Sequence, residues 1–163
     1  MVIDNRKDDV PPYTIEDCKR DTMDHIDQVR EFMNICIRDL EERAVKHDLS
    51  KLQSPEVEIF TELTPKLKHS TYGSDEYKGF LTELGDALKH HYAHNSHHPE
   101  HYENGIRGMN LLDIIEMFCD WKAATMRHND GDIRKSIEMN KERFGYSDDL
   151  LNIFMNTVSL FDK

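Results

Sequence analysis

The sequence predicts an all-α protein, a single-domain bundle of five to six helices. Apolar residues recur at spacings of three and four along most of the chain, and no segment shows the alternation with period two that a half-buried strand needs. A chain of 163 residues is also long enough for one domain with its own core. We therefore expect a flexible arm over residues 1–12 and one helical domain over residues 13–163.

The first predicted helix runs to about Val45, and Thr14 is a suitable N-cap because acidic residues follow it in the first turn. Its apolar residues share one face, which we expect to be half-buried: Ile26, Val29, Met33, Cys36 and Leu40. A second helix is predicted to begin at Ser54-Pro55-Glu56, with an N-cap, a proline at the first helical position and a first-turn acid. Pro65 is expected to kink or end it.

Four further helices are expected. One spans about residues 75–94, and the next spans about residues 111–128 with Asn110 as its cap. A short helix then ends at Gly145, and Ser147 caps the last one.

Composition restricts the function. The chain has 32 acidic residues against 21 Lys and Arg, a formal charge of −11, so a groove for a long nucleic acid is not expected. A single nucleotide stays compatible, because bound cations can supply local positive charge. Three widely spaced cysteines suggest reduced thiols, and the absence of a signal-like or 18-residue apolar run suggests a cytoplasmic protein without a membrane span.

Histidine is concentrated in one short stretch. Six of the ten histidines lie within residues 90–101, where a solvated helix would more often use Lys, Glu or Gln. His90 and His94 share a helix face, and His97 and His98 are neighbours in a loop, where two consecutive residues can point at different ions. Neutral imidazole is the commonest metal ligand, so the stretch predicts a metal site.

Three other pairs of residues are candidates for the same metal site. Asp21 and His25 lie one helical turn apart, although a lone histidine on such a helix is usually a surface or core residue. His47-Asp48 offers two adjacent ligands, and a carboxylate can bridge two cations. Glu116 and Asp120 also lie one turn apart, and the apolar neighbours of Asp120 mean that its carboxylate needs a partner.

The order His25, His47-Asp48, Asp120 resembles the H…HD…D order of the HD-domain metal-dependent phosphohydrolases. Residues 21–26, 47–51 and 97–100 resemble the acid-Thr-x-x-His-Ile, HD-x-G-K and second His-His segments of the HD-GYP subgroup. The chain departs from that subgroup at Asp21, which replaces a glutamate, at Ser50, which replaces a glycine, in the short spacing from His98 to Asp120, and in lacking the GYP tripeptide. It also resembles an uncharacterised phage and bacterial family with HD and HHPEH motifs, over about residues 20–125.

The resemblance implies a single-domain helical bundle of the HD-domain type around one or two divalent transition-metal ions: Mn, Fe, Co, Ni or Zn. The first ion would be held by His25, His47, Asp48 and Asp120. Asp48 would bridge to a second ion, held by His97, His98 and one of His90, His91 and His94. We prefer His91, because it continues the buried face predicted from Leu84 and Leu88.

In the implied reaction the ions polarise a phosphoryl oxygen and lower the pKa of a bridging water. Asp48 and Lys51 would be the catalytic residues. The candidate phosphate contacts are Lys51, Arg30, Arg107 and Lys122. Residues that would orient the histidines or add ligands are Asp21, His90, His94, Glu100, His101 and Glu116.

These features predict a metal-dependent phosphohydrolase acting on a nucleotide or a related small phosphate ester. A cyclic-nucleotide or cyclic-dinucleotide phosphodiesterase is an alternative that the missing GYP tripeptide disfavours. The same residues also suit a non-catalytic metal-binding interaction module, with four protein ligands closing its site, or a di-iron oxygenase. The sequence leaves the base, the number of phosphates, the native metal and the oligomeric state open.

Overall fold

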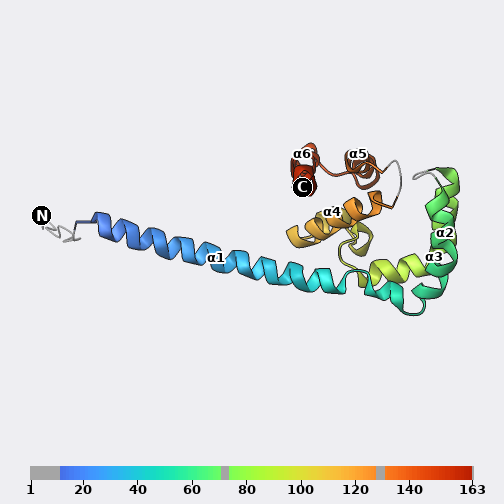
Figure 1. The fold of residues 1–163 in the computed structure, drawn as a ribbon, viewed down its shortest axis with the longest axis horizontal. Helices are drawn as coiled ribbons and strands as arrows, with labels where there is room; N and C mark the ends of the chain where they lie inside the picture. Colours follow the sequence, from blue (N-terminus) through green and yellow to red (C-terminus); the bar gives the residue numbers. More distant parts are fainter. Residues whose placement is uncertain (1–11, 71–73, 128–130, 163) are drawn as a thin grey trace, which may run out of the picture. The chain divides into compact units, whose positions relative to one another are not determined.

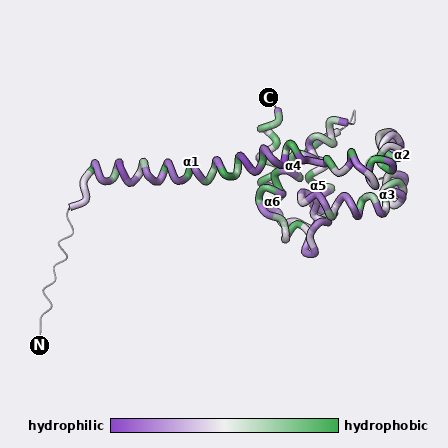
Figure 2. The backbone as a smooth tube through the Cα atoms, turned by 90° about the horizontal axis from the view of Figure 1, so that it is seen from below, coloured by the Kyte–Doolittle hydropathy of each residue, from purple (hydrophilic) through white to green (hydrophobic). Residues whose placement is uncertain are grey.

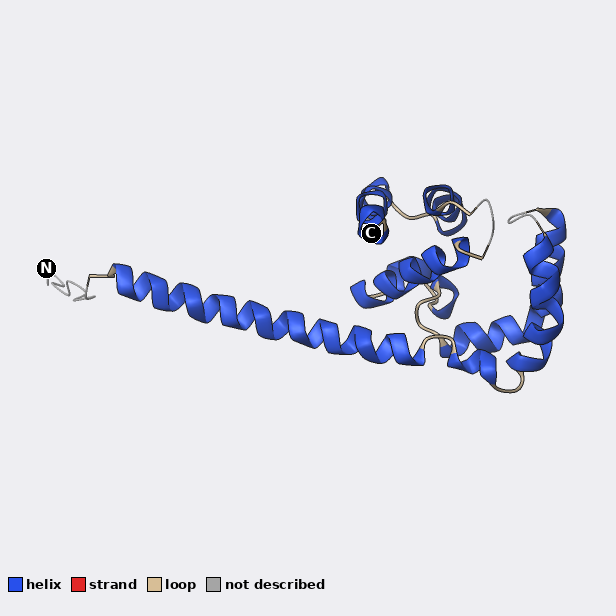
Figure 3. Ribbon diagram, viewed as in Figure 1, coloured by secondary structure: helices blue, strands red, loops and turns tan. Residues whose placement is uncertain are grey.

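The computed structural model describes residues 12–70, 74–127 and 131–162, and every regular element in these ranges is a helix (Figures 1 and 3). The all-α prediction is confirmed. The chain forms two compact units, Met1–Asp39 and Leu40–Lys163. The bounds of the domain predicted over residues 13–163 remain a prediction. The predicted arm lies outside the described residues except for Pro12. Within the described ranges, no helix combines the length and the apolar character needed to cross a membrane.

The first unit contains the N-terminal part of α1 (Ile15–Lys46). Thr14 caps this helix as expected, because its hydroxyl accepts from the Asp17 N–H at 3.1 Å while the Asp17 carboxylate accepts from the Thr14 N–H at 3.0 Å. The expected half-buried face is not found, since α1 has no buried residue and Ile26 and Met33 are 42% and 59% exposed. In Figure 2 hydrophobic segments recur along an otherwise hydrophilic α1.

The second unit begins with the last turns of α1, the 3-10 helix η1 (Leu49–Leu52) and a pair of packed helices, α2 (Glu56–His69) and α3 (Asp75–His94). The bounds of α3 match the prediction, and Gly85 takes the positive φ of +26° that lets the helix kink. Pro65 does not end α2, which continues to His69, because a proline removes one backbone hydrogen bond and leaves the neighbouring ones in place.

The main hydrophobic core lies in the rest of this unit, after the short 3-10 helices η2 (Pro99–His101) and η3 (Gly105–Gly108). It is built by α4 (Leu111–Thr125), α5 (Ile133–Phe144), α6 (Asp148–Thr157) and η4 (Val158–Phe161). Its buried residues are Met117, Phe118, Ile133, Ile137, Tyr146, Phe154 and Val158. The helix predicted to reach His128 ends at Thr125, while the predicted caps Asn110, Gly145 and Ser147 are all present.

Asp113 connects α4 to the segments around it. Its fully buried carboxylate accepts from the Asn110 N–H, the Tyr102 hydroxyl, the Ser96 hydroxyl and the Arg43 guanidinium at 2.7–2.9 Å. Burial opposes ionisation, but these donors together hold the pKa of Asp113 below its usual value. The carboxylate is therefore ionised and paired in the folded protein.

Asp113→Asn is expected to lower the free energy of unfolding by about 3 kcal/mol, because it removes the charge of a buried carboxylate that pairs with the half-buried Arg43 guanidinium. A carboxyl whose pKa is depressed by folding stabilises the native state above its unfolded pKa and loses that effect as pH falls through the folded pKa. The difference in the free energy of unfolding between wild type and Asp113→Asn should thus be constant from pH 5 to 7 and shrink below about pH 4. Urea unfolding measures it, with exposed Asp149→Asn as the control. Equal midpoints for wild type and Asp113→Asn would show that the network is not stabilising.

Candidate metal centre

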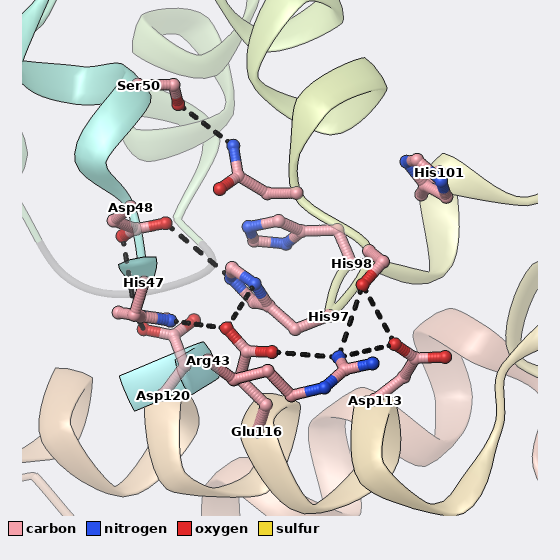
Figure 4. A network of polar contacts seen from close by, with 12 residues as sticks. Arg43, His47, Asp48, Ser50, His97, His98, His101, Asp113, Glu116 and Asp120 are labelled. Carbon is pink, nitrogen blue, oxygen red and sulfur yellow. Dashed lines mark hydrogen bonds and ion pairs between the residues drawn. The ribbon is translucent and has the colours of Figure 1, made fainter. Parts of the chain in front are cut away.

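Four histidines and three acids from distant parts of the sequence meet in the second unit (Figure 4). His47 and Asp48 follow the end of α1, His91 lies in α3, and the remaining residues come from the loop before η2 and from α4. We call this group the His–Asp cluster; it comprises His47, Asp48, His91, His97, His98, Glu116 and Asp120.

Asp48 lies at the centre of the cluster. Its backbone is left-handed, with φ 58° and ψ 13°, a conformation that aspartate tolerates better than most residues. It precedes η1 without capping it, so its carboxylate is free to face the imidazoles. The Nε2 atoms of His91 and His97 lie 3.3 and 3.6 Å from Asp48 Oδ1, and His47 Nε2 lies 3.5 Å from Oδ2.

Two atoms at this centre are unsatisfied. Asp48 Oδ1 and His97 Nε2 are buried without a hydrogen-bond partner. Such atoms lose their hydration on folding and cost about 1–3 kcal/mol each unless another group replaces the water. Both are strong metal donors, so a cation beside them would satisfy the two atoms at once. The arrangement therefore fits a metal ion.

The donor atoms fall into two groups that share Asp48. One group contains Asp48, His91, His97 and His98, and the other contains His47, Asp48 and Asp120, with the ligand atoms of each group within 4.8 Å of one another. In the first group His91 Nε2 and His98 Nε2 lie 2.9 Å apart. In the second, His47 Nε2 lies 3.7 Å from Asp120 Oδ1. The shared carboxylate is thus placed to bridge two ions.

Glu116 orients the imidazoles of His47 and His97. Its Oε1 accepts from His47 Nδ1 at 3.0 Å and from His97 Nδ1 at 3.1 Å, and Arg43 donates to its Oε2 at 3.2 Å. A histidine that donates from Nδ1 keeps the lone pair on Nε2. Once its ring is neutral, each of these histidines therefore presents its Nε2 lone pair toward Asp48, as a metal ligand must. Glu116 also lies close enough to these histidines to be a ligand itself, but its hydrogen bonds to them account for that proximity.

Glu56 orients the imidazoles of His90 and His91. It is fully buried in the first turn of α2, where it accepts from His90 Nδ1 at 2.7 Å and from His91 Nδ1 at 2.9 Å. Ser50 donates to it at 3.0 Å. Burial opposes ionisation, yet the donors hold the pKa of Glu56 below its usual value. The charged carboxylate fixes the His91 ring with Nε2 toward Asp48.

The cluster has the electrostatics of a cation site. The Asp120 carboxylate, 3.7 Å from Nε2, and then the hydrogen bond to Glu116 outweigh burial and raise the pKa of His47 to about 10. Burial and the neighbouring His97 lower the pKa of His98 to about 3, so this ring is neutral and can offer a lone pair. Burial opposes ionisation of Asp48, but the His91 imidazole 3.3 Å from Oδ1 and the Lys51 charge hold its pKa below the usual range. The carboxylates stabilise a proton on His47, and a divalent cation supplies the same kind of positive charge.

Solvent reaches one side of the cluster. The side chains of His91 and His97 are 1% and 2% exposed, whereas those of His47, Asp120 and Lys51 are 29%, 26% and 31% exposed. Lys51 donates to Asp48 Oδ2 at 2.6 Å, and its ammonium lies 5.2 Å from the centre of the Phe60 ring. The open side thus carries a cation next to the central carboxylate.

The second unit brings together eight of the residues that the sequence singled out, and it places His91, the preferred member of its trio, inside the cluster. These eight are His47, Asp48, Lys51, His91, His97, His98, Glu116 and Asp120. Their roles as metal ligands or catalytic groups remain predictions.

Three predicted residues, His25, Asp21 and Arg30, lie in the first unit on exposed positions of α1. The His–Asp cluster of the second unit does not include them. Asp21 accepts from the Tyr13 hydroxyl at 2.9 Å, and Arg30 pairs with Asp27 at 2.6 Å. The first ligand of the H…HD…D order is thus not among the residues that surround Asp48 in the second unit.

The other predicted residues have different partners. His90 donates to Glu56, and the neighbouring His94 donates from Nδ1 to the His90 carbonyl at 2.8 Å. Glu100, in η2, accepts from Arg143 at 2.6 Å. His101 donates to the Tyr92 carbonyl at 2.7 Å.

The last two predicted phosphate contacts also lie outside the donor groups. Arg107 is exposed in η3, where it lines a surface hollow with Glu100 and Arg143. Lys122 is half-buried on α4, two residues after Asp120. Neither belongs to the groups around Asp48.

Sequence reasoning missed three contributors. Glu56 was predicted only as a first-turn acid, and nothing local distinguishes it from a solvated one. Arg43 was not singled out, although it joins Asp113 and Glu116. Asn95, whose amide donates to Ser50 Oγ at 2.9 Å, does carry a signal, because it follows His91 by one helical turn.

The chain was compared with known proteins. No curated protein and no solved structure matches it. A family model described as a family of unknown function, DUF5662, matches residues 14–160, which includes the whole His–Asp cluster. The chain therefore belongs to the DUF5662 family.

Proposed function

We propose that the His–Asp cluster binds one or two divalent transition-metal ions and that the protein is a metal-dependent phosphohydrolase acting on a nucleotide or a related small phosphate ester. The observation that carries the proposal is the carboxylate of Asp48, which faces imidazole nitrogens on both oxygens while Oδ1 has no hydrogen-bond partner. The HD and HH pairs and Asp120, which resemble the ligand order of HD-domain phosphohydrolases, support this class of reaction.

The donor set supports transition metals. Imidazole nitrogens and carboxylate oxygens together suit Mn, Fe, Co, Ni or Zn, whereas sites for Mg and Ca are built from oxygen ligands. The first group would supply three imidazoles and one carboxylate, and the second one imidazole and two carboxylates. The two groups share Asp48, so this carboxylate would belong to both sites.

The exposure of the cluster favours a catalytic site over a closed structural one. A structural site is usually filled by four protein ligands, while a catalytic site keeps a position for water or substrate. The group of His47, Asp48 and Asp120 has three protein donors and lies on the side that solvent reaches. A small phosphate ester could approach there, next to the Lys51 ammonium.

The residues of the chain have distinct tasks in this proposal. Glu56 and Glu116 each hold a proton on histidine Nδ1 atoms, which keeps the Nε2 lone pairs directed at the ions. Bound ions would polarise a phosphoryl oxygen and lower the pKa of a water molecule. Lys51 would bind a phosphate oxygen and stabilise the charge that develops on the phosphoryl group.

The experiment is a phosphate-release assay on protein loaded with Mn, Co or Fe. The panel contains nucleoside mono-, di- and triphosphates, a cyclic nucleotide and an aryl phosphate, with chelator-treated protein as the control. The cyclic nucleotide is scored by chromatography, because its hydrolysis gives a monoester and no free phosphate. We expect release from at least one monoester or nucleotide that stops on chelation. Metal-loaded, folded protein without activity on any member of the panel would contradict the enzyme and favour a metal-binding module.

Glu56→Gln is expected to weaken metal binding by about 10- to 100-fold, the usual cost of losing a group that orients a metal-bound histidine. The amide keeps the size of the side chain but lacks the charge that fixes the His91 ring. Competition with a fluorescent chelator measures the affinity, and exposed Glu58→Gln in the same turn of α2 is the matched control. Equal affinities for Glu56→Gln and wild type would show that Glu56 has no part in the site.

A further inference from the structure

The N-terminal part of α1 leaves its apolar residues uncovered. Ile26 and Val29 are 42% exposed, Met33 is 59% exposed and Phe32 is 66% exposed. A helix gains most of its stability in water from packing an apolar face against another element. The first unit offers no other helix for this purpose within residues 12–39, so the face needs a partner.

The spacing of these residues indicates the kind of partner. Thr22, Ile26, Val29, Met33 and Cys36 are separated by alternating steps of four and three residues. This repeat of 3.5 residues keeps one stripe facing a second helix in a left-handed coiled coil. We call these five residues together with Ile15, one heptad before Thr22, the α1 stripe.

The remaining faces of the helix need no partner. Arg20 pairs with Asp17 at 2.8 Å, and Arg30 pairs with Asp27 at 2.6 Å, both within the helix. These charged pairs lie outside the α1 stripe and are more than half exposed except for Asp17. The helix is therefore amphipathic, with one face suited to a helix and the others to water.

We propose that α1 pairs in parallel with α1 of a second copy of this chain through the α1 stripe. A partner helix must repeat every 3.5 residues over the same length, and a second copy does so by identity. Phe32 and Ile37 flank the stripe on opposite sides, five residues apart, and are 66% and 48% exposed. In a parallel coiled coil such positions meet across the interface, so each Phe32 packs against Ile37 of the other copy.

The amount of apolar surface agrees with this partner. Eight apolar side chains of residues 15–37 are more than a third exposed: Ile15, Met23, Ile26, Val29, Phe32, Met33, Ile35 and Ile37. All but Ile35 lie on the stripe or flank it. Covering them on two copies removes on the order of 1,000 Å² from water, near the lower bound of specific interfaces. The pairing is independent of the metal site and of the proposed activity.

Cys36 provides a direct test, because a stripe residue faces its own copy in a parallel pair. In the Cys18→Ser, Cys119→Ser variant, Cys36 is the remaining thiol. Diamide takes two electrons and two protons from two thiols as the disulfide forms. We expect most of the protein to become a covalent dimer at micromolar concentration. The matched control carries Glu31→Cys, on the opposite face, together with Cys36→Ser. Monomer in both proteins, or equal cross-linking in both, would overturn the parallel pairing.

A second measurement avoids chemical modification. Sedimentation equilibrium should give wild type the mass of at least two chains and Ile26→Lys the mass of one. Ile35→Lys, which changes the same residue type outside the α1 stripe, should behave as wild type. Circular dichroism shows whether each variant stays helical. A single-chain mass for wild type, as expected if its own second unit covers the stripe, would overturn the proposal, and so would equal masses for all three proteins.

Discussion

Asp48→Ala is expected to lower phosphate release by more than about 100-fold, because it removes a donor from both groups of the His–Asp cluster at once. Even residues that only orient metal ligands cost about 10- to 100-fold when they are lost. The substitution also removes the carboxylate that faces His47, His91 and His97. We expect the bound metal to fall together with the activity.

The design for Asp48 separates chemistry from folding. Asp48→Asn keeps the shape of the side chain and tolerates the left-handed backbone at this position, so it controls for strain. Asp86→Ala, an exposed acid on α3, controls for the loss of a carboxylate. The measurement is the initial rate of phosphate release at saturating metal. Wild-type rates in both Asp48 variants would mean that the reaction takes place elsewhere.

Lys51→Met is expected to retain metal and to lower kcat/KM by about 30- to 1,000-fold. This corresponds to the 2–4 kcal/mol or so by which a positioned charge stabilises a transition state. Methionine keeps an apolar stem beside Phe60, where the lysine ammonium now lies 5.2 Å from the ring centre. Only the charge and its bond to Asp48 are lost.

The control for Lys51 is Lys89→Met, an exposed lysine on α3 that pairs only locally with Asp86. Metal content is measured beside the kinetics. If Lys51→Met lost its metal, the lysine would act by holding Asp48 in place. If it kept both metal and wild-type kcat/KM, Lys51 would not contact the reacting phosphate.

The sequence predicts the helices well where local chemistry defines their ends. The bounds of α3 agree with the prediction, and Asn110 and Asp113 form the expected capping box, because caps depend on residues within one turn. The end of α4 and the passage of α2 through Pro65 were predicted less well. A proline removes one backbone hydrogen bond without deciding whether the next ones continue the helix, so the residue type alone does not give the end of α2.

Some residues of the candidate site could be predicted from the sequence, and others could not. His47, Asp48 and the histidines near residue 97 stand out, because these residue types are rarely clustered without a chemical reason. Glu56 and Arg43 could not be found from the sequence, since an acid in a first turn and an arginine in a last turn are ordinary surface residues. Only the fold buries Glu56 beside the histidines and brings the half-buried Arg43 to Glu116.

The first helix shows the limit of periodicity. Its repeat indicates a face that needs covering but does not identify what covers it. The half-buried face predicted for α1 is exposed, and with it His25, Asp21 and Arg30 lie in a unit separate from the cluster. The alternation of four and three residues, read together with this exposure, points to a partner helix.

Metal content tests the central claim most directly. Protein is equilibrated with Mn, Fe, Co, Ni and Zn in turn, dialysed, and analysed by mass spectrometry for bound metal per chain. We predict one or two equivalents of at least one metal in wild type and in His101→Ala, whose histidine lies outside the cluster and donates to the Tyr92 carbonyl. We predict a large loss in His97→Ala, which removes one of the two unsatisfied atoms. Negligible metal in wild type, or the same content in His97→Ala and wild type, would contradict a metal centre at Asp48.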